Sequence, residues 1–579
     1  MALAYGNFHE LSHQLRFLLF EIGIGLPQSS IDYFIAQAHK NALDRLQHSA
    51  VAEGIITAPI ASHHVHDFID QLQITLKHSN PESQFYQWSS IRDELDESIA
   101  NDALAQAYKQ RWNVQICNEA YQYDSLWSWI NNNQTAHQAF LFLEQWGDQG
   151  HPDYPGFRAK MGFTRREVLQ KSPEFQAKIS LHWCALSKHK INTAPDSTNF
   201  NALIAREFPN EHKLWQEKLQ FNHLNPQEYV PVPVHPWQWR NKLQIMCSQL
   251  TDCKSLILFP HHQTVMPSMS LDTMMPIDHS NTLIKLAVNV STPDPSKTAT
   301  SEEEQYNCAM VDWINSLLTK SDHYQNTLFL AHDLARLRVN SSSVSNYFQK
   351  ELSVNLLQHP SSVIKAEQKI VPLMSLFANS PLSNKPLLVE IIMESGLTPI
   401  NYFSQYCHTV LLGQLHLLLK YGVSLKAKPH NTLIIFSDHR PQGLILQSLE
   451  KIKVDYSPSF EESKKPDLPA TSSIKSTSLD AIRTVFTHGT LQNNLGHWIN
   501  CLKQQYSLGA NQLWHIVYDV MQTVLNDLSM EIHPRLFCWQ KHQLLHDIWQ
   551  HQCLLTMRLK GDLSKDIYRA KLNPLNPCY

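Results

Sequence analysis

The residues His151-Pro-Asp-Tyr-Pro-Gly-Phe-Arg158-Ala-Lys160-Met-Gly162 combine the groups needed to hold an anion. The prolines restrict the path of the backbone, and Gly162 lets the backbone approach a ligand closely. Arg158 and Lys160 can donate charge-assisted hydrogen bonds to carboxylate or phosphate oxygens. The same residues are compatible with a solvated turn before a helix, so the local sequence leaves both interpretations open.

A second unusual string is Pro231-Val-Pro-Val-His235-Pro236-Trp237-Gln238-Trp239, in which a strand-like run stops at His-Pro. A turn in the core explains its two tryptophans equally well. Histidine is abundant, with 32 residues, and the densest groups are His63-His64-Val65-His66 and His261-His262. Neither group has the i, i+4 helical pair and third ligand of a zinc site, so we interpret both as surface or turn residues.

Apolar spacing indicates which elements must position these residues. The N-terminal part shows the period of helices. The segments 228–234, 256–259 and 282–290 are strand-like, and the runs 431–437 and 443–446 flank a hairpin. We therefore predict an α+β fold with four parts: a mainly helical N-terminal region at 1–145, an α+β core with a mixed central β-sheet at 146–456, a linker at 457–477 and a helical C-terminal region at 478–579.

Bulk composition narrows the function. The chain has 579 residues, of which 43% are hydrophobic and 17% charged, as in ordinary globular proteins. Its 48 basic and 52 acidic side chains give a net charge of -4, which excludes a broad basic surface for nucleic acid. No apolar stretch approaches the roughly 18 residues needed to cross a bilayer. The ten cysteines are scattered without a Cys-x-x-Cys pair. We therefore expect a cytoplasmic protein with no membrane or nucleic-acid partner.

Together, the two strings resemble motifs of the aerobactin-synthetase (IucA/IucC) family of NRPS-independent siderophore synthetases. That family carries a His-Pro-x-His-Pro-x-x-Lys-x-Arg-x-Gly-Phe loop and a later strand ending in His-Pro-Trp-Gln-Trp, which is the more specific match. Further family motifs follow in the same order. Ser-x-Arg-Thr corresponds to Ser270-Leu-Asp-Thr273, a strand lysine to Lys285, and His-x-Gln-Asn to Lys428-Pro-His-Asn431.

The resemblance implies a synthetase with palm, fingers and thumb-like regions that uses ATP and Mg²⁺ to activate a citrate-like carboxylic acid as an acyl-adenylate. An amine or alcohol then attacks the acyl carbon. Carried over by position, the resemblance gives catalytic roles to His151, Lys160 and Lys285, and contact with the acid to Arg158 and His235. It assigns the nucleotide to Ser270, Thr273, Lys285, Lys297, His430 and Asn431, and the metal to Asn431 and Glu450.

Several positions depart from the family pattern. The second histidine of the loop is Tyr154, and the histidine of the later motif is Lys428. Asp272 stands in place of a phosphate-binding arginine. The family's Arg-Asp pair, whose aspartate serves the metal, is replaced by Gln447-Ser448. Each such charged contact is worth about 1.5–3 kcal/mol, so these changes bear directly on activity.

The leading hypothesis is a siderophore-biosynthesis ligase for an acid and an amine or alcohol. The alternative is a catalytically degenerate paralogue of the same fold that binds a carboxylate or a partner synthetase, and a third is an unrelated helical scaffold. We expect His151, Ser270, Lys285 and Asn431 to converge on one cleft, with Asp272 paired to a nearby lysine. A homodimer and a monomer are both compatible with the sequence.

Overall fold

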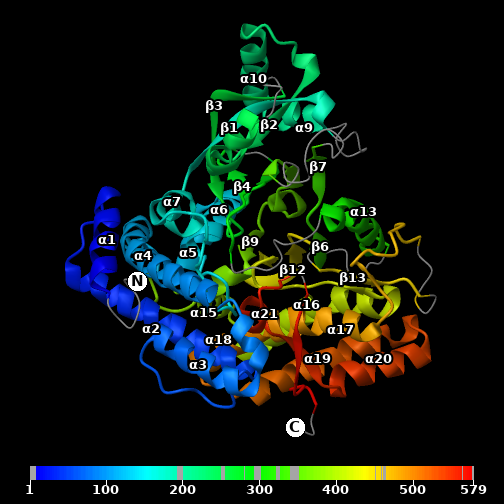
Figure 1. The fold of residues 1–579 in the computed structure, drawn as a ribbon. Coiled ribbons are helices and arrows are strands. Elements are labelled where there is room, and N and C mark those ends of the chain that lie inside the picture. The colour runs from blue at the N-terminus through cyan, green and yellow to red at the C-terminus, as the bar shows by residue number, and fades with distance from the viewer. Residues whose placement is uncertain are drawn as a thin grey trace.

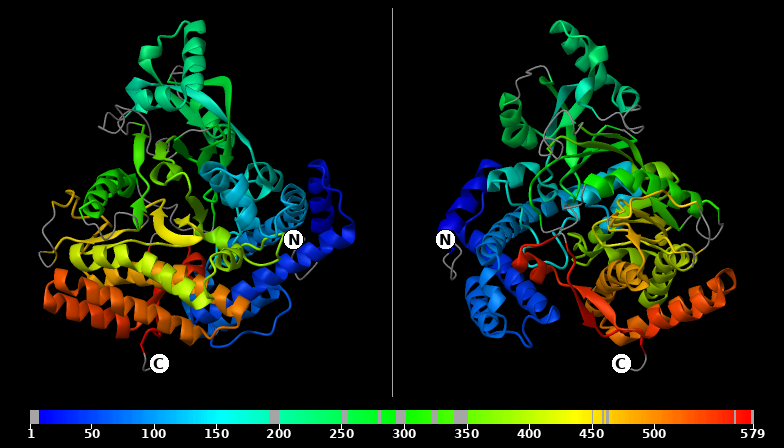
Figure 2. Two further views of the ribbon diagram at one scale, coloured as in Figure 1. Left: turned by 180° about the vertical axis from the view of Figure 1, so that it is seen from behind. Right: turned by 45° about the vertical axis from the view of Figure 1, so that its right-hand side comes forward.

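The computed structural model describes residues 8–191, 200–249, 255–278, 281–292, 301–320, 327–339, 351–449, 451–457, 460, 464–563 and 565–576. An upper sheet with its own helices stands on a broad base of helices (Figure 1). The N-terminal helices form one side of this base and the C-terminal helices the other, as the rear view also shows (Figure 2). Among the described residues, no helix combines the length and apolarity of a membrane span.

The N-terminal side of the base is a set of packed helices. Thr135 starts the last of them with a capping box, in which its hydroxyl accepts from the Gln138 N–H and the Gln138 side chain accepts from the Thr135 N–H. The long helix α4 packs along α2 with an apolar face. The bounds are α1 (His9–Glu21), α2 (Gln28–Ala52), α3 (Val65–Ser79), α4 (Trp88–Glu119), α5 (Leu126–Asn133) and α6 (Ala136–Trp146).

The upper sheet has seven antiparallel strands in the order β2-β1-β3-β4-β5-β8-β7. The sequence predicts β2, β5 and the start of β3, but it gave no prediction for β1, β7 or β8. The strands are β1 (Ile179–Ser187), β2 (Tyr229–Val234), β3 (Leu256–Pro267), β4 (Thr273–Pro276), β5 (Thr282–Leu286), β7 (Asp333–Leu337) and β8 (Val354–Gln358). The helices around it are α7 (Arg165–Lys171), α9 (Phe200–Glu207), α10 (Pro209–Phe221), α11 (Pro236–Gln238), α12 (Gln244–Gln249) and α13 (Ser301–Leu318).

A second sheet of four strands, in the order β6-β12-β11-β9, lies below the first. Its hairpin is tighter than predicted, because Asp438 and His439 alone form the turn with φ of 46° and 61°. Two successive residues in this left-handed region match the twist of a hairpin. The strands are β6 (Leu328–Leu330), β9 (Lys369–Pro372), β11 (Thr432–Ser437) and β12 (Arg440–Leu446).

Helix α6 fills the space between the two sheets. Its Phe140 and Leu141 pack in one buried cluster with Met275 and Leu283 of the upper sheet and Ile435 of the lower sheet. These apolar contacts fix the position of one sheet relative to the other, because a close-packed interior leaves little freedom to slide.

The C-terminal side of the base is built around α16, which is buried along most of its length. Gly422 ends this helix at φ 66°, and a Cβ there would lie 2.8 Å from Cβ of Asp455. Tyr406 stacks on Trp498 at 3.8 Å and donates to Asn494 at 2.6 Å. The bounds are α15 (Leu387–Glu394), α16 (Pro399–Tyr421), α17 (Leu479–Phe486), α18 (Gly496–Tyr506), α19 (Ala510–Leu528), α20 (Pro534–His546) and α21 (Leu554–Lys560).

Short strands also occur in the two regions where the sequence predicts a linker and a helical C-terminal part. A three-stranded sheet joins β10 to β13 and β14, and the last of these falls within 457–477. The chain ends with an antiparallel pair after α20. These strands are β10 (Val423–Ser424), β13 (Lys453–Asp455), β14 (Lys475–Ser476), β15 (Trp549–Gln552) and β16 (Tyr568–Lys571).

A buried carboxylate ties the two sides of the base together. Glu53, just after α2, accepts hydrogen bonds from the N–H groups of Leu555 and Thr556, both at 2.7 Å, and from the Thr556 hydroxyl. Burial raises the pKa of Glu53 from 4.5 to about 7, although these hydrogen bonds oppose the rise.

Replacing Glu53 by glutamine is expected to remove a pH dependence of stability. Because the folded protein holds the Glu53 proton up to about pH 7 and the unfolded chain releases it near 4.5, the free energy of unfolding falls as pH rises from about 4.5 to 7 and levels off above that. Wild type should lose on the order of 2–3 kcal/mol in free energy of unfolding, relative to Glu53→Gln, between pH 5 and 8. Urea denaturation at both pH values measures this. A difference that stays constant with pH would contradict the assignment.

Candidate functional site

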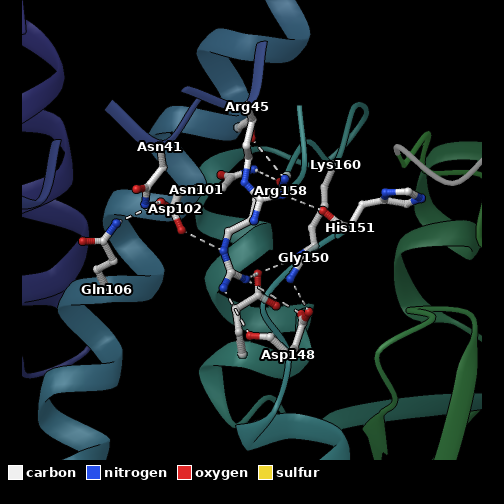
Figure 3. A network of polar contacts seen from close by, with 12 residues as sticks. Asn41, Arg45, Asn101, Asp102, Gln106, Asp148, Gly150, His151, Arg158 and Lys160 are labelled. Carbon is white, nitrogen blue, oxygen red and sulfur yellow. Dashed lines mark hydrogen bonds and ion pairs between the residues drawn. The ribbon is translucent and has the colours of Figure 1, made fainter. Parts of the chain in front are cut away.

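The loop that follows α6 is held against the N-terminal helices (Figure 3). Arg45 of α2 donates to the carbonyls of His151 at 3.0 Å and Pro152 at 2.9 Å. Asn101 of α4 donates to the Arg158 carbonyl at 3.0 Å. The loop is therefore ordered by helix side chains, and the interpretation as a solvated turn does not describe it.

The two predicted cations of this loop point into the protein. Nε of Arg158 donates to Asp102 at 2.9 Å (Figure 3). Nη1 of Arg158 lies 3.6 Å from Glu174. Lys160 donates to the same Glu174. Burial opposes the charge of Arg158, but Asp148, Asp102 and Glu174 raise its pKa above the usual value. Arg158 and Lys160 therefore help to hold the loop in place, and their predicted contact with the acid and catalytic role stay predictions.

Tyr154, at the second histidine position of the family motif, is also internal. Its hydroxyl donates to Glu94 of α4 at 2.6 Å, and the other oxygen of Glu94 lies 3.3 Å from Arg558 of α21. Burial, followed by the charge of Glu94, raises the pKa of Tyr154 well above its usual value. The tyrosine therefore joins the loop to the N- and C-terminal helices as a neutral donor.

His151 does face another predicted site residue. The centroids of its ring and of the His430 ring are 5.6 Å apart. Asn431, the next residue, uses its amide within its own turn: Oδ1 accepts from the Lys428 N–H at 2.9 Å, and Nδ2 donates to the Lys426 carbonyl at 3.0 Å. Asn431 thus shapes the turn that presents His430.

Glu144, near the end of α6, connects this turn to the Ser270 loop. One carboxylate oxygen accepts from the Met269 N–H at 3.0 Å, and the other accepts from Nε2 of Gln447 at 3.3 Å. The Gln447 N–H in turn donates to the Asn431 carbonyl at 2.9 Å. Burial raises the pKa of Glu144 to about 7. The sequence analysis missed Glu144, because only the fold places α6 beside Gln447.

A polar row crosses the upper sheet beside the Ser270 loop. Strand register pairs Thr273 with Lys285, Lys285 with Asn355, and Asn355 with Arg336. Directly paired residues share one face of an antiparallel sheet, so this row runs across β4, β5, β8 and β7. Arg338, two residues beyond Arg336, donates to Oδ1 of Asn355 at 2.7 Å, which places its guanidinium on the same face.

Charges along this row are partly balanced within the protein. Nζ of Lys285 lies 4.0 Å from Oδ2 of Asp272, as expected from the sequence. Arg336 is buried and bonds to Asp333 through two nitrogens, Nε at 2.6 Å. Ser270 lies close by, with its hydroxyl 2.9 Å from that of Ser268. Arg336 and Arg338 are alternate residues at the end of β7 and just beyond it. This spacing becomes informative only once β8 is known to lie beside them.

His235, predicted to contact the acid, is buried, and that contact stays a prediction. Its ring is 1% exposed, and Nδ1 accepts from the Trp237 N–H at 3.2 Å, so it caps the short helix α11. Burial, with Lys171 and His182 nearby, lowers its pKa to about 3. His235 is therefore a neutral core residue that ends β2.

Two predicted ligands, Lys297 and Glu450, lie outside the described residues. Within the described ranges, no group of three or more histidine, cysteine, aspartate or glutamate residues is arranged to hold a metal ion.

Comparisons with known proteins show which sequences and folds this chain resembles. The sequence model described as the IucA / IucC family matches residues 139–378, from α6 through β9. The fold is similar to that of petrobactin biosynthesis protein AsbB from Bacillus anthracis, with a TM-score of 0.78 at 16% identity over 95% of this chain and 97% of that one. The central part of the chain, residues 139–378, therefore matches the IucA / IucC family.

Two other known proteins are similar to this chain over most of their length. Aerobactin synthetase IucC from Klebsiella pneumoniae gives a TM-score of 0.73 at 15% identity, covering 94% of this chain and 98% of that one. The D-ornithine–citrate ligase of Staphylococcus aureus is 22% identical over an alignment that covers 95% of this chain and 86% of the ligase. A second sequence model, described as ferric iron reductase FhuF-like transporter, matches residues 401–566. The turn carrying His430 falls in this second range.

Arg158→Ala is expected to lower the free energy of unfolding by about 3–5 kcal/mol, because it leaves buried carboxylates without their cation. The control is Arg166→Ala, which removes an exposed arginine paired with Glu21 and should change stability by less than about 1 kcal/mol. Chemical denaturation followed by circular dichroism measures both. Equal, small effects would contradict the structural role of Arg158.

Proposed function

We propose that this protein condenses a citrate-type carboxylic acid with an amine or alcohol, using ATP to activate the acid for siderophore biosynthesis. A carboxylate oxygen of the acid attacks the α-phosphorus of ATP and pyrophosphate leaves. The amine nitrogen or alcohol oxygen then attacks the acyl carbon, AMP leaves, and an amide or ester forms. The match of residues 139–378 to the IucA / IucC family and the name of the related D-ornithine–citrate ligase support this reaction class.

The observation that carries the proposal is the chain of contacts joining four distant segments. His151 faces His430, the Asn431 carbonyl accepts from Gln447, and Glu144 bridges Gln447 to the Ser270 loop. Lys285 is paired with Thr273 on the neighbouring strand. We propose that these segments form a single site, in which cations, hydroxyls and imidazoles serve a reaction between an acid, a triphosphate and a nucleophile.

The residues of the polar row fit the phosphates of a nucleotide. Lys285 is half-buried on β5, and Arg338, the residue after β7, is half-buried with its guanidinium oriented by Asn355. Both are donors of the kind that bind phosphate oxygens, and the Ser270 and Thr273 hydroxyls lie beside them. The negative charge of Asp272 repels phosphate. In our proposal, the positive charge of Arg338 offsets this repulsion.

Glu144 is the residue that fits best beside a magnesium ion. It contacts Gln447, the neighbour of Ser448, where the family pattern places a metal-binding aspartate. The amide oxygen of Asn431 is already bonded to Lys428, which favours Glu144 over Asn431 as a ligand. When bound with ATP, Mg²⁺ would neutralise phosphate charge. Glu144 would then be held ionised, because a nearby cation lowers a carboxyl pKa.

His151 and His430 are proposed to move the proton of the attacking nucleophile. An imidazole exchanges protons readily near neutral pH, and the two rings lie at the junction of the loop and the His430 turn. Both histidines sit on ordered backbone turns, which keeps the two imidazoles in position.

Pyrophosphate release is expected only when ATP, Mg²⁺, a polycarboxylate such as citrate and an amine are supplied together. Lys285→Met should lower kcat/KM by roughly 10- to 100-fold, since a charged contact is worth about 1.5–3 kcal/mol. The matched control, Lys320→Met, removes an exposed lysine at the end of α13 and should retain activity. A coupled pyrophosphate assay checks both. Binding of Mg–ATP without turnover on any acid and amine would favour the degenerate paralogue.

Asp272→Asn is expected to strengthen Mg–ATP binding by roughly fivefold, because a like charge of about 1 kcal/mol is removed from beside the phosphates. Asp278→Asn, an exposed position shortly after β4, is the control and should leave affinity unchanged. Isothermal titration calorimetry measures the affinity of each variant. Weaker binding after Asp272→Asn would mean that the carboxylate supports the metal instead of repelling phosphate.

A further inference from the structure

A polar hollow, apart from the polar row, lies on the upper sheet between α7, the start of β1 and α11. It encloses about 510 Å³. Lys171, Lys178, His182 and Arg240 line it, together with Ser180 and Pro236. We call it the basic groove. Among the described residues that line it, none is acidic, so every charge it presents is positive.

Local structure explains why these cations gather. Helix α7 ends at Lys171, where a basic residue is favourable, and the chain returns into β1 from Ile179. Ser180 and His182 are alternate residues of that strand and so project from the same face. On the other side, His235 caps α11, and the wide turn Trp239–Leu243 that follows carries Arg240.

The cations act on one another as a cluster. Burial lowers the pKa of Lys171; the nearby Glu167 opposes this, and Arg240 lowers the pKa by a smaller amount. Lys171 and His182 also act on His235 beneath the groove. Like charges held close together disfavour the empty state, so a bound anion would relieve their repulsion. With a net charge of -4, the chain has no general attraction for anions, which makes this cluster a local feature.

The groove is separate from the proposed phosphate row. In the strand order, β3 and β4 lie between β1 and β5. At about 4.8 Å per strand, Ser180 and His182 are therefore roughly 14 Å or more from Lys285. A molecule the size of citrate cannot span that distance, so a ligand in the groove is not the acid undergoing reaction at Lys285.

We infer that the basic groove is a second binding site for a small polyanion with two or three closely spaced negative charges. Arg240 offers a planar fork, Lys171 and Lys178 offer ammonium groups, and Ser180 offers a hydroxyl, which together match clustered carboxylate or phosphate oxygens. Its size suits a free small molecule, and the inference stands independently of the proposed ligase activity. Citrate and inorganic pyrophosphate represent the carboxylate and phosphate sources of such an anion.

Calorimetry on the full chain tests this with Lys178→Gln/Arg240→Gln, both exposed positions whose replacement spares the core. Each probe is titrated into the protein without ATP. The variant should bind citrate, pyrophosphate or both at least tenfold more weakly than wild type, and the probe bound more tightly identifies the source. The control Lys213→Gln/Lys218→Gln removes two exposed lysines from α10 and should bind as wild type does.

Three outcomes would overturn the inference: no saturable binding of either probe to wild type, equal affinity in the groove variant, or equal loss in the control. Pyrophosphate release measured on the same samples keeps the two proposals apart. Anion binding that depends on the groove in a protein without turnover would support the groove and contradict the ligase. Turnover in wild type, combined with unchanged anion binding in the groove variant, would support the ligase and contradict the groove.

Discussion

The buried carboxylate of Glu144 is the contact on which the arrangement of the site depends. It lies near the end of α6, whose Phe140 and Leu141 separate the two sheets, and it binds one segment beside each sheet through Met269 and Gln447. A buried carboxylate without partners is strongly disfavoured, so both segments must stay where they can donate to it. The apolar packing of α6 and the polar contacts of Glu144 therefore set the same spacing between the sheets.

The chain uses its positive charges in two different ways. Arg158 and Lys160, within the motif that first suggested anion binding, are neutralised by Asp102 and Glu174 and hold the loop against the helices. Lys285 and Arg338 lie on the polar row of the sheet, and Lys285 faces Asp272, which stands where the family has an arginine. In our account the loop provides a rigid frame for His151, and the sheet provides the charge that meets phosphate.

Sequence alone gave the fold class, several strands of the core and the family, because these rest on local periodicity and on strings such as Pro231–Trp239. It also placed Lys285 and Asp272 correctly as neighbours. It did not anticipate that Arg158 would be buried, because its partner Asp102 lies on α4 and cannot be identified from spacing. It also did not anticipate the burial of His235, which depends on tertiary packing. Arg338 and Glu144 were missed for a related reason: each becomes informative only through a neighbour distant in sequence, Asn355 and Gln447.

The central claim is that a nucleotide binds across β4, β5, β8 and β7, with Glu144 beside its metal. A crystal structure of the protein with Mg²⁺ and a non-hydrolysable ATP analogue tests it most directly. The account predicts phosphate oxygens within hydrogen-bonding distance of Nζ of Lys285 and of the Arg338 guanidinium, and a carboxylate oxygen of Glu144 facing the cation. Phosphates bound against Arg158 and Lys160, with their carboxylate pairs broken, would contradict it.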